Sequence, residues 1–190
     1  GRLANWWTPE DFAKFEAAGK ALIAQYDEYQ AFPDLNLNGE LTLGENIADL
    51  SGLATAYDAY KLSLKGQPGE TIGGYTPDQR LFLGFGQVWR TKYREEALRN
   101  LVLTSPHSPP QFRVNGVVRN MDAWYEAFNV QPGEALYLPP ADRVVEGGGE
   151  QHPLAALGRR LQDAAHAGEE AHVGHVVGLV DDGDLDGAEV

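Results

Sequence analysis

A pair of carboxylates one helical turn apart constrains this chain more than any other feature. Residues 44–49, with the sequence GENIAD, follow a Gly- and Asn-containing turn and predict a helix from about residue 45 to about residue 65. A helix places Glu45 and Asp49 on one face, beside small and apolar residues. Acids in such surroundings are costly to bury without a cation. A metal ion with histidine ligands would compensate them, with Glu45 as a direct ligand and Asp49 orienting a ligating imidazole.

The spacing by itself also allows a purely structural interpretation. Acids in the first turn of a helix interact favourably with the helix dipole whatever the protein does. If the helix begins at residue 45, Glu45 and Asp49 would both benefit from this effect. The pattern alone leaves the two interpretations open.

Composition excludes several classes of partner. The 190 residues carry a net charge of −13, which argues against nucleic acid or an anionic membrane surface as a partner. The chain has no cysteine, and therefore neither disulfides nor thiolate metal sites, and no apolar run long enough for a membrane segment. The first residues show neither an initiator Met nor a signal peptide, so we expect the chain to derive from a longer protein.

Most of the chain reads as helix. Thr8-Pro9 and Thr76-Pro77 are helix starts, the second with a glutamine suited to a capping box, and they predict helices over residues 9–29 and 77–93. Further helices are expected over residues 95–102 and, capped by Asn120, over residues 121–128. The intervening ranges are expected to be loops, with a short strand within residues 112–118; these ranges are 32–43, 66–75, 104–115 and 131–143.

The longer string around the two acids carries a family resemblance. Residues 37–49, LNGELTLGENIAD, closely resemble the segment that supplies the third zinc ligand in the neprilysin family of zinc metallopeptidases. The resemblance implies that Glu45 binds zinc and that Asp49 holds a zinc-ligand histidine in place.

Three more segments resemble that family, in the family's order. Residues 1–7 (GRLANWW) resemble the segment after the family's HExxH helix, residues 85–89 (FGQVW) a helix lining the S1′ pocket, and residues 107–113 (HSPPQFR) the HSPxxFR segment. The resemblance implies that Val88 and Trp89 line S1′, that His107 stabilises the tetrahedral intermediate, and that Arg113 binds a substrate backbone carbonyl. Without the resemblance, His107 is an ordinary loop histidine and Trp89 a core residue.

Two departures from the family pattern bear on activity. Ser105 stands where the family often has an acid that can hold the arginine. A hydroxyl cannot pair with Arg113 as a carboxylate would, so we expect looser anchoring of the substrate. No HExxH occurs in the 190 residues, although that motif supplies two zinc ligands and the general base. With Glu45 as the sole remaining ligand, we expect the isolated chain to bind catalytic zinc poorly and not to hydrolyse peptides.

The resemblance ends near residue 144. Residues 145–190 are expected to form a disordered, acidic, low-complexity tail; residues 146–190 carry ten acids and two bases and use only residue types encoded by GC-rich codons. We therefore hypothesise out-of-frame or read-through translation. The tail holds a His172/His175 pair beside acids and, at 182–187, the first half of an EF-hand-like loop. Both patterns are incomplete as metal sites.

The sequence therefore predicts a mainly α fold, the C-terminal helical part of a thermolysin-like zinc metallopeptidase domain over residues 1–144. The implied function is that of a zinc-dependent metalloendopeptidase which cleaves oligopeptides on the amino side of hydrophobic residues, with Zn²⁺ as cofactor in the full-length parent. Expected partners are peptide substrates and the upstream part of the same catalytic domain. The resemblance implies an extracytoplasmic location, whether periplasmic, secreted or membrane-anchored.

Two other classes of function stay open. One is a non-catalytic, peptide-binding remnant of the same fold, which would use Val88, Trp89 and Arg113 without chemistry. The other is an acidic calcium-binding module, which rests only on the tail.

Overall fold

The computed structural model describes residues 7–144, and within them the expected mainly α fold is confirmed. The elements, in chain order, are α1 Pro9–Asp27, β1 Gln30–Phe32, β2 Leu35–Asn36, α2 Gly39–Ser63, α3 Pro77–Val88, α4 Glu95–Thr104, α5 Pro110–Val118, α6 Asp122–Phe128 and a 3-10 turn at Pro140–Asp142. The tail and its two metal-like patterns lie outside the described residues, so those expectations stay predictions.

Helix α1 begins as expected and is followed by a hairpin that the sequence does not reveal. The Thr8 side chain accepts a hydrogen bond from the Asp11 N–H, and Pro9 occupies the first turn. The helix ends at Asp27. Part of the expected loop 32–43 is a two-stranded antiparallel hairpin, in which Gln30 pairs with Asn36. Such short strands carry no periodic signal, because two or three residues show no alternation.

Helix α2 begins six residues earlier than the sequence predicts. Asn38 is the N-cap, and its side-chain oxygen accepts a hydrogen bond from the Leu41 N–H. The Asn-Gly pair therefore caps the helix rather than forming a turn before it. As a consequence, Glu40 is the acid of the first turn, whereas Glu45 lies beyond it.

The later helices differ from expectation in two places. The Thr76–Gln79 capping box of α3 is confirmed, but α3 ends at Val88 rather than residue 93, which leaves Trp89 at its C-cap. The expected strand within 112–118 is wrong, because Pro110–Val118 is helix α5. Pro110 suits the first turn of a helix. Burial of Val117 and Val118 overrides the β preference of valine.

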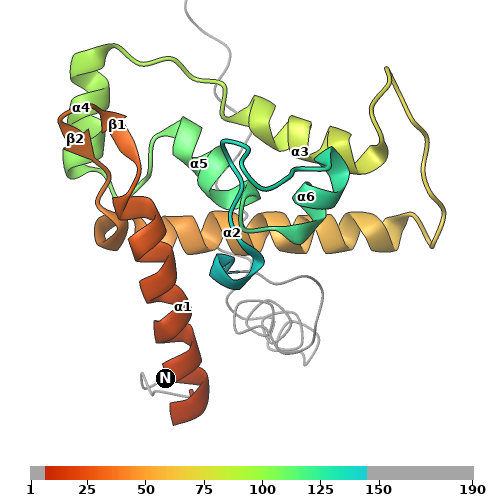
Figure 1. Ribbon diagram of the computed structural model, residues 1–190, viewed down its shortest axis with the longest axis horizontal. Coiled ribbons are helices and arrows are strands. Elements are labelled where there is room, and N and C mark those ends of the chain that lie inside the picture. The colour runs from red at the N-terminus through yellow and green to blue at the C-terminus, as the bar shows by residue number, and fades with distance from the viewer. Residues whose placement is uncertain (1–6, 145–190) are drawn as a thin grey trace, which may run out of the picture. The chain divides into compact units, whose positions relative to one another are not determined.

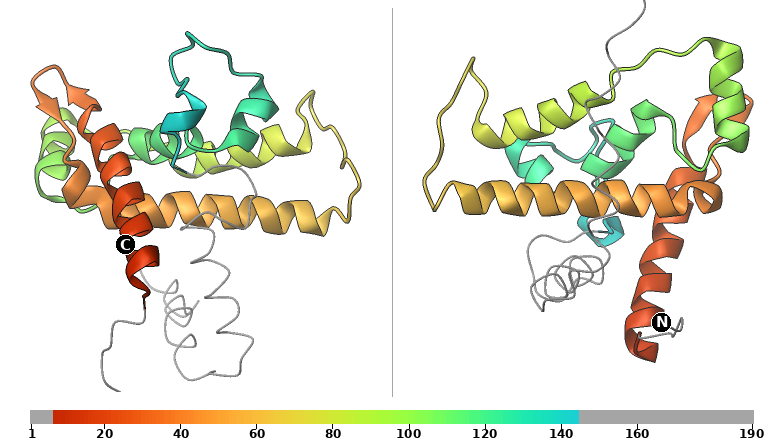
Figure 2. Two further views of the ribbon diagram at one scale, coloured as in Figure 1. Left: turned by 60° about the horizontal axis from the view of Figure 1, so that its bottom comes forward. Right: turned by 180° about the vertical axis from the view of Figure 1, so that it is seen from behind.

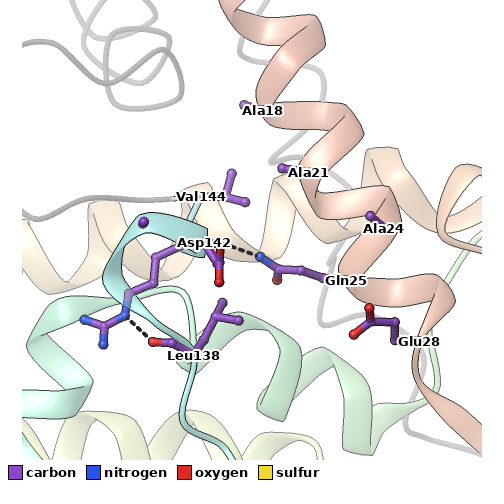
Figure 3. A pocket seen from close by; sticks show the side chains of 10 residues that line it. Ala18, Ala21, Ala24, Gln25, Glu28, Leu138, Asp142 and Val144 are labelled. Atoms are coloured by element: carbon purple, nitrogen blue, oxygen red, sulfur yellow. Dashed lines mark hydrogen bonds between the residues drawn. The ribbon is translucent and has the colours of Figure 1, made fainter. Parts of the chain in front are cut away.

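The sequence predicts that Asn120 caps α6, and this is wrong, because the N-cap is Met121. Asn120 is instead fully buried and forms a hub of four side-chain hydrogen bonds. Its amide donates to the Gly116 carbonyl and exchanges hydrogen bonds with the Gln25 amide of α1. Its Oδ1 also accepts from the Val144 N–H. Gln25 donates in turn to the Asp142 carbonyl (Figure 3). These bonds fasten residues 142–144 to α1, where the two segments border a cavity of about 530 Å³.

Helices α1 and α5 meet at Tyr26. Helix α1 crosses α2 near the N-terminal end of α2 (Figure 1), and α3, α5 and α6 lie along one side of α2 (Figure 2). Tyr26 of α1 is fully buried and donates to the Phe112 carbonyl of α5. A Cβ on Gly116 would lie 2.5 Å from the Tyr26 hydroxyl oxygen, so α5 can approach α1 only without a side chain there. Burial raises the pKa of Tyr26, so its hydroxyl stays a donor.

No helix within residues 7–144 combines the length and the apolar character needed to cross a bilayer.

The crossing of α1 and α2 gives a first prediction. A Cβ at Gly39 would lie 2.3 Å from the Ile23 carbonyl oxygen, a backbone atom that cannot move aside cheaply. Gly39→Ala should therefore lower the free energy of unfolding by about 1–3 kcal/mol. Gly52→Ala on the same helix meets nothing within 4 Å and should raise it by about 0.5–1 kcal/mol. Urea unfolding measures both values, and equal effects would contradict the close approach.

Candidate active site

Glu45 and Asp49 share a face of α2, as predicted, but not in its first turn. The helix dipole acts mainly on the first and last turns. Since α2 starts at Gly39, the dipole does not account for the position of either acid. The explanation of their spacing by the helix dipole is therefore wrong.

The carboxylate of Asp49 forms a bidentate ion pair with Arg113 of α5. Arg113 Nε donates to Asp49 Oδ2 and Nη2 donates to Oδ1, both at 2.6 Å. The side chains are only 13% and 10% exposed, respectively. The hydrogen bonds to Asp49 raise the pKa of Arg113, so the guanidinium stays charged. The two residues are 64 positions apart in the sequence, and their pair joins α2 to α5.

The ring of Trp89 lies against the guanidinium group of Arg113. The guanidinium carbon of Arg113 lies 4.0 Å from the centroid of the Trp89 ring, within the range of a cation–π contact. Trp89 is partly buried, whereas its neighbour Val88 is 75% exposed and stands apart from these contacts. Trp89 thus contributes to holding Arg113, in addition to any role in lining S1′.

His107 faces Glu45. Its Nε2 lies 3.2 Å from Glu45 Oε2, and Arg113 Nη2 lies 3.7 Å from the same oxygen. Glu45 is 39% exposed and His107 is 48% exposed, so both side chains are open to solvent on one side. The structure therefore brings five of the six predicted residues into one cluster, with its more exposed edge at Glu45 and His107.

The side chain of Ser105 is hydrogen-bonded to the backbone of His107. Its hydroxyl oxygen accepts a hydrogen bond from the His107 N–H at 3.0 Å, which closes a turn next to the histidine. Asp49 supplies the carboxylate for Arg113, so the arginine is not loosely held. Sequence reasoning missed this because Asp49 and Arg113 are distant in the chain.

Sequence reasoning also overlooked a buried polar line beneath the cluster. Ser108 donates to Asn46 Oδ1 at 2.8 Å, and Asn46 Nδ2 donates to the Thr42 hydroxyl at 3.0 Å. All three side chains are at most 3% exposed. The i, i+4 spacing of Thr42 and Asn46 was a usable signal for their contact. No sequence pattern linked either residue to Ser108.

These residues alone do not form a zinc site. Catalytic zinc requires three protein ligands. Within residues 7–144 no group of three or more His, Asp or Glu side chains is placed to hold a metal ion. Asp49 is engaged by Arg113, which leaves Glu45, half-exposed at the cluster's edge, as a carboxylate able to supply one ligand.

Solved structures place the fold among zinc metalloproteases. The chain superposes on the Mycobacterium tuberculosis zinc metalloprotease Zmp1 with a TM-score of 0.74 and 47% identity, over 76% of this chain and 23% of that one. PepO from Lactobacillus rhamnosis gives a TM-score of 0.63 and 35% identity, over 76% and 21% of the two chains.

The sequence comparisons give the family. The profile of Peptidase family M13 matches residues 1–144. Neprilysin-2 of Drosophila melanogaster is 39% identical over 140 residues, and human endothelin-converting enzyme 1 is 37% identical over 143. These matches cover 72% and 73% of this chain but only 18% of each relative, so the chain spans about a fifth of their length. The chain belongs to peptidase family M13, which confirms the neprilysin resemblance.

The ion pair between α2 and α5 gives a second prediction. In a double-mutant cycle of Asp49→Asn and Arg113→Gln, the free energies of unfolding should show a coupling of about 2 kcal/mol. This coupling is expected because both side chains are largely buried and are joined by two hydrogen bonds. The exposed Glu10–Lys14 pair of α1 is the matched control and should show a far smaller coupling. Equal couplings for the two pairs would argue against a buried, bidentate contact.

Proposed function

We propose that this chain is the C-terminal part of the catalytic domain of a zinc-dependent metalloendopeptidase that cleaves oligopeptides on the amino side of hydrophobic residues. Glu45 would be the third zinc ligand, and Asp49 would orient a ligating histidine from the upstream part of the domain. Such an enzyme would act outside the cytoplasm, as the family resemblance implies. The supporting observation is the convergence of Glu45, Asp49, His107 and Arg113 from two helices and a loop.

The geometry suits the assigned roles. When bound, zinc supplies an activated water and polarises the scissile carbonyl. His107, at the exposed edge beside Glu45, is placed to donate a hydrogen bond to the oxyanion that develops on that carbonyl. Arg113 uses its Nε and Nη2 for Asp49, and its other N–H groups remain for a substrate backbone carbonyl. The bidentate pair and the Trp89 ring would hold those donors in a fixed direction.

Asp49 can serve two partners in this scheme. Each oxygen of its carboxylate accepts one hydrogen bond from Arg113, and a carboxylate oxygen has two lone pairs. Asp49 therefore retains acceptor capacity for the imidazole N–H of a zinc-ligand histidine. Val88, exposed at the end of α3, would contribute an apolar wall for the substrate side chain.

A chimera tests the proposal, because the chain lacks HExxH. Residues 1–144 would replace the matching C-terminal segment of the Lactobacillus helveticus neutral endopeptidase, which is 37% identical over 147 residues. The chimera should bind one zinc and hydrolyse a peptide with a hydrophobic residue after the scissile bond. Glu45→Gln should abolish zinc binding and lower kcat/KM by at least about 100-fold, since the metal contributes several kcal/mol. The isolated chain should show neither property.

Glu40→Gln is the matched control, since Glu40 is an exposed acid in the first turn of the same helix. It should leave zinc content and hydrolysis unchanged. If the folded chimera kept the same zinc content after Glu45→Gln, the assignment of Glu45 as a zinc ligand would be refuted. Peptide binding that depends on Arg113 without hydrolysis would favour the non-catalytic alternative, and robust hydrolysis by the isolated chain would contradict its expected inactivity.

A further inference from the structure

A line of buried hydrogen bonds runs beneath the Glu45–His107 contact, from the α4–α5 loop into α2. Ser108 is 2% exposed and Asn46 is 1% exposed, and they meet through the Ser108 hydroxyl and Asn46 Oδ1 at 2.8 Å. The line continues from Asn46 Nδ2 to the Thr42 hydroxyl, and from that hydroxyl to the Asn38 carbonyl at 3.0 Å.

All the hydrogen bonds in this line run from donor to acceptor in the same direction, or are fixed by the bond that follows them. The Thr42 hydroxyl gives its hydrogen to the Asn38 carbonyl, so its oxygen must accept from Asn46. The amide nitrogen of Asn46 therefore faces Thr42, and its oxygen is left to accept from Ser108. Asn46 and Thr42 each use one donor and one acceptor, and Ser108 uses its donor, so the line selects one orientation of the Asn46 amide.

The two central residues are chain neighbours of the two groups above them. Asn46 directly follows Glu45, and Ser108 directly follows His107. The side chains of Glu45 and His107 are 39% and 48% exposed, so little packing fixes their separation. The buried bond between their neighbours is the firmer constraint, because leaving either of its partners unsatisfied has a high cost.

We propose that Asn46 and Ser108 are positioning residues that fix the distance between His107 and Glu45; this inference rests on the proposed function. The pair holds the loop that carries the oxyanion donor in register with the helix that carries the metal ligand. Thr42 belongs to the same buried line, but its side-chain hydrogen bonds run to Asn46 and Asn38, within α2 and its cap, so its loss leaves the bond between Ser108 and Asn46 in place. A purely structural role would make Thr42 and Ser108 equivalent, whereas a positioning role would not.

Nuclear magnetic resonance of the full chain tests this without catalysis. The ring signals of His107, assigned by His107→Gln, should shift at fixed pH when Glu45 is changed to Gln, because the two groups are in contact. This shift should persist in Thr42→Val and in the conservative Ser108→Thr. It should largely disappear in Ser108→Ala and in Ser108→Cys, which nearly conserves volume but is a weak donor.

Circular dichroism identifies folded variants, and Ser108→Cys keeps the test decisive if Ser108→Ala unfolds. The proposal would be overturned if Glu45→Gln still shifted the His107 ring signals fully in folded Ser108→Ala or Ser108→Cys. It would also be overturned if Thr42→Val reduced that shift as much as Ser108→Ala does, or if Glu45→Gln alone caused no shift.

A kinetic arm separates this inference from the proposed function. In the chimera, Ser108→Ala should lower kcat about tenfold or more with little change in KM, while Thr42→Val should not. An unchanged kcat in Ser108→Ala, or an equal fall in Thr42→Val, would overturn the positioning role. A chimera without zinc or activity would refute the proposed function, while the ring signals would still decide whether Ser108 places His107.

Discussion

The ion pair between Asp49 and Arg113 is the interaction on which the rest of the site depends. It is doubly hydrogen-bonded, largely buried, and joins α2 to α5. A charge in that position requires a partner, so each residue defines where the other must lie. Trp89 then completes the arginine's surroundings, and His107 and Glu45 occupy the adjacent, more exposed edge. The cluster thus combines a largely buried side at Asp49 and Arg113 with a more exposed one at Glu45 and His107.

Local chemistry made much of the helical framework predictable. The caps at Thr8 and Thr76 and the apolar spacing after them located the starts of α1 and α3, because cap and first-turn preferences act over a few residues. The errors arose where local preference conflicts with tertiary packing. Valines 117 and 118 favour strand by themselves, yet they are buried on α5. Asn120 resembles a cap, but its side chain makes four hydrogen bonds to Gln25, Gly116 and Val144.

The candidate site was predictable in composition but not in its pairings. The motif resemblance identified the residues that cluster, and the family match to residues 1–144 agrees with it. Sequence could not show that Asp49 holds Arg113, or that Ser108 reaches Asn46, because these contacts span 64 and 62 residues. Long-range pairs depend on how helices cross, and that depends on close approaches such as Gly39 against Ile23, which leave no periodic trace in the sequence.

The hub at Asn120 has a consequence for how this domain tolerates change at its C-terminal side. The Val144 N–H and the Asp142 carbonyl are both bound to the Gln25–Asn120 amide pair, and Val144 itself is 5% exposed. Residue 144 therefore supplies one of the four hydrogen bonds of the buried Asn120 side chain. A chain shortened to residue 143 would lose one of the two donors to Asn120 Oδ1, together with the buried Val144 side chain. An attachment made beyond residue 144 would leave these bonds in place, so the Asn120 hub should tolerate change after Val144 better than change at Val144 itself.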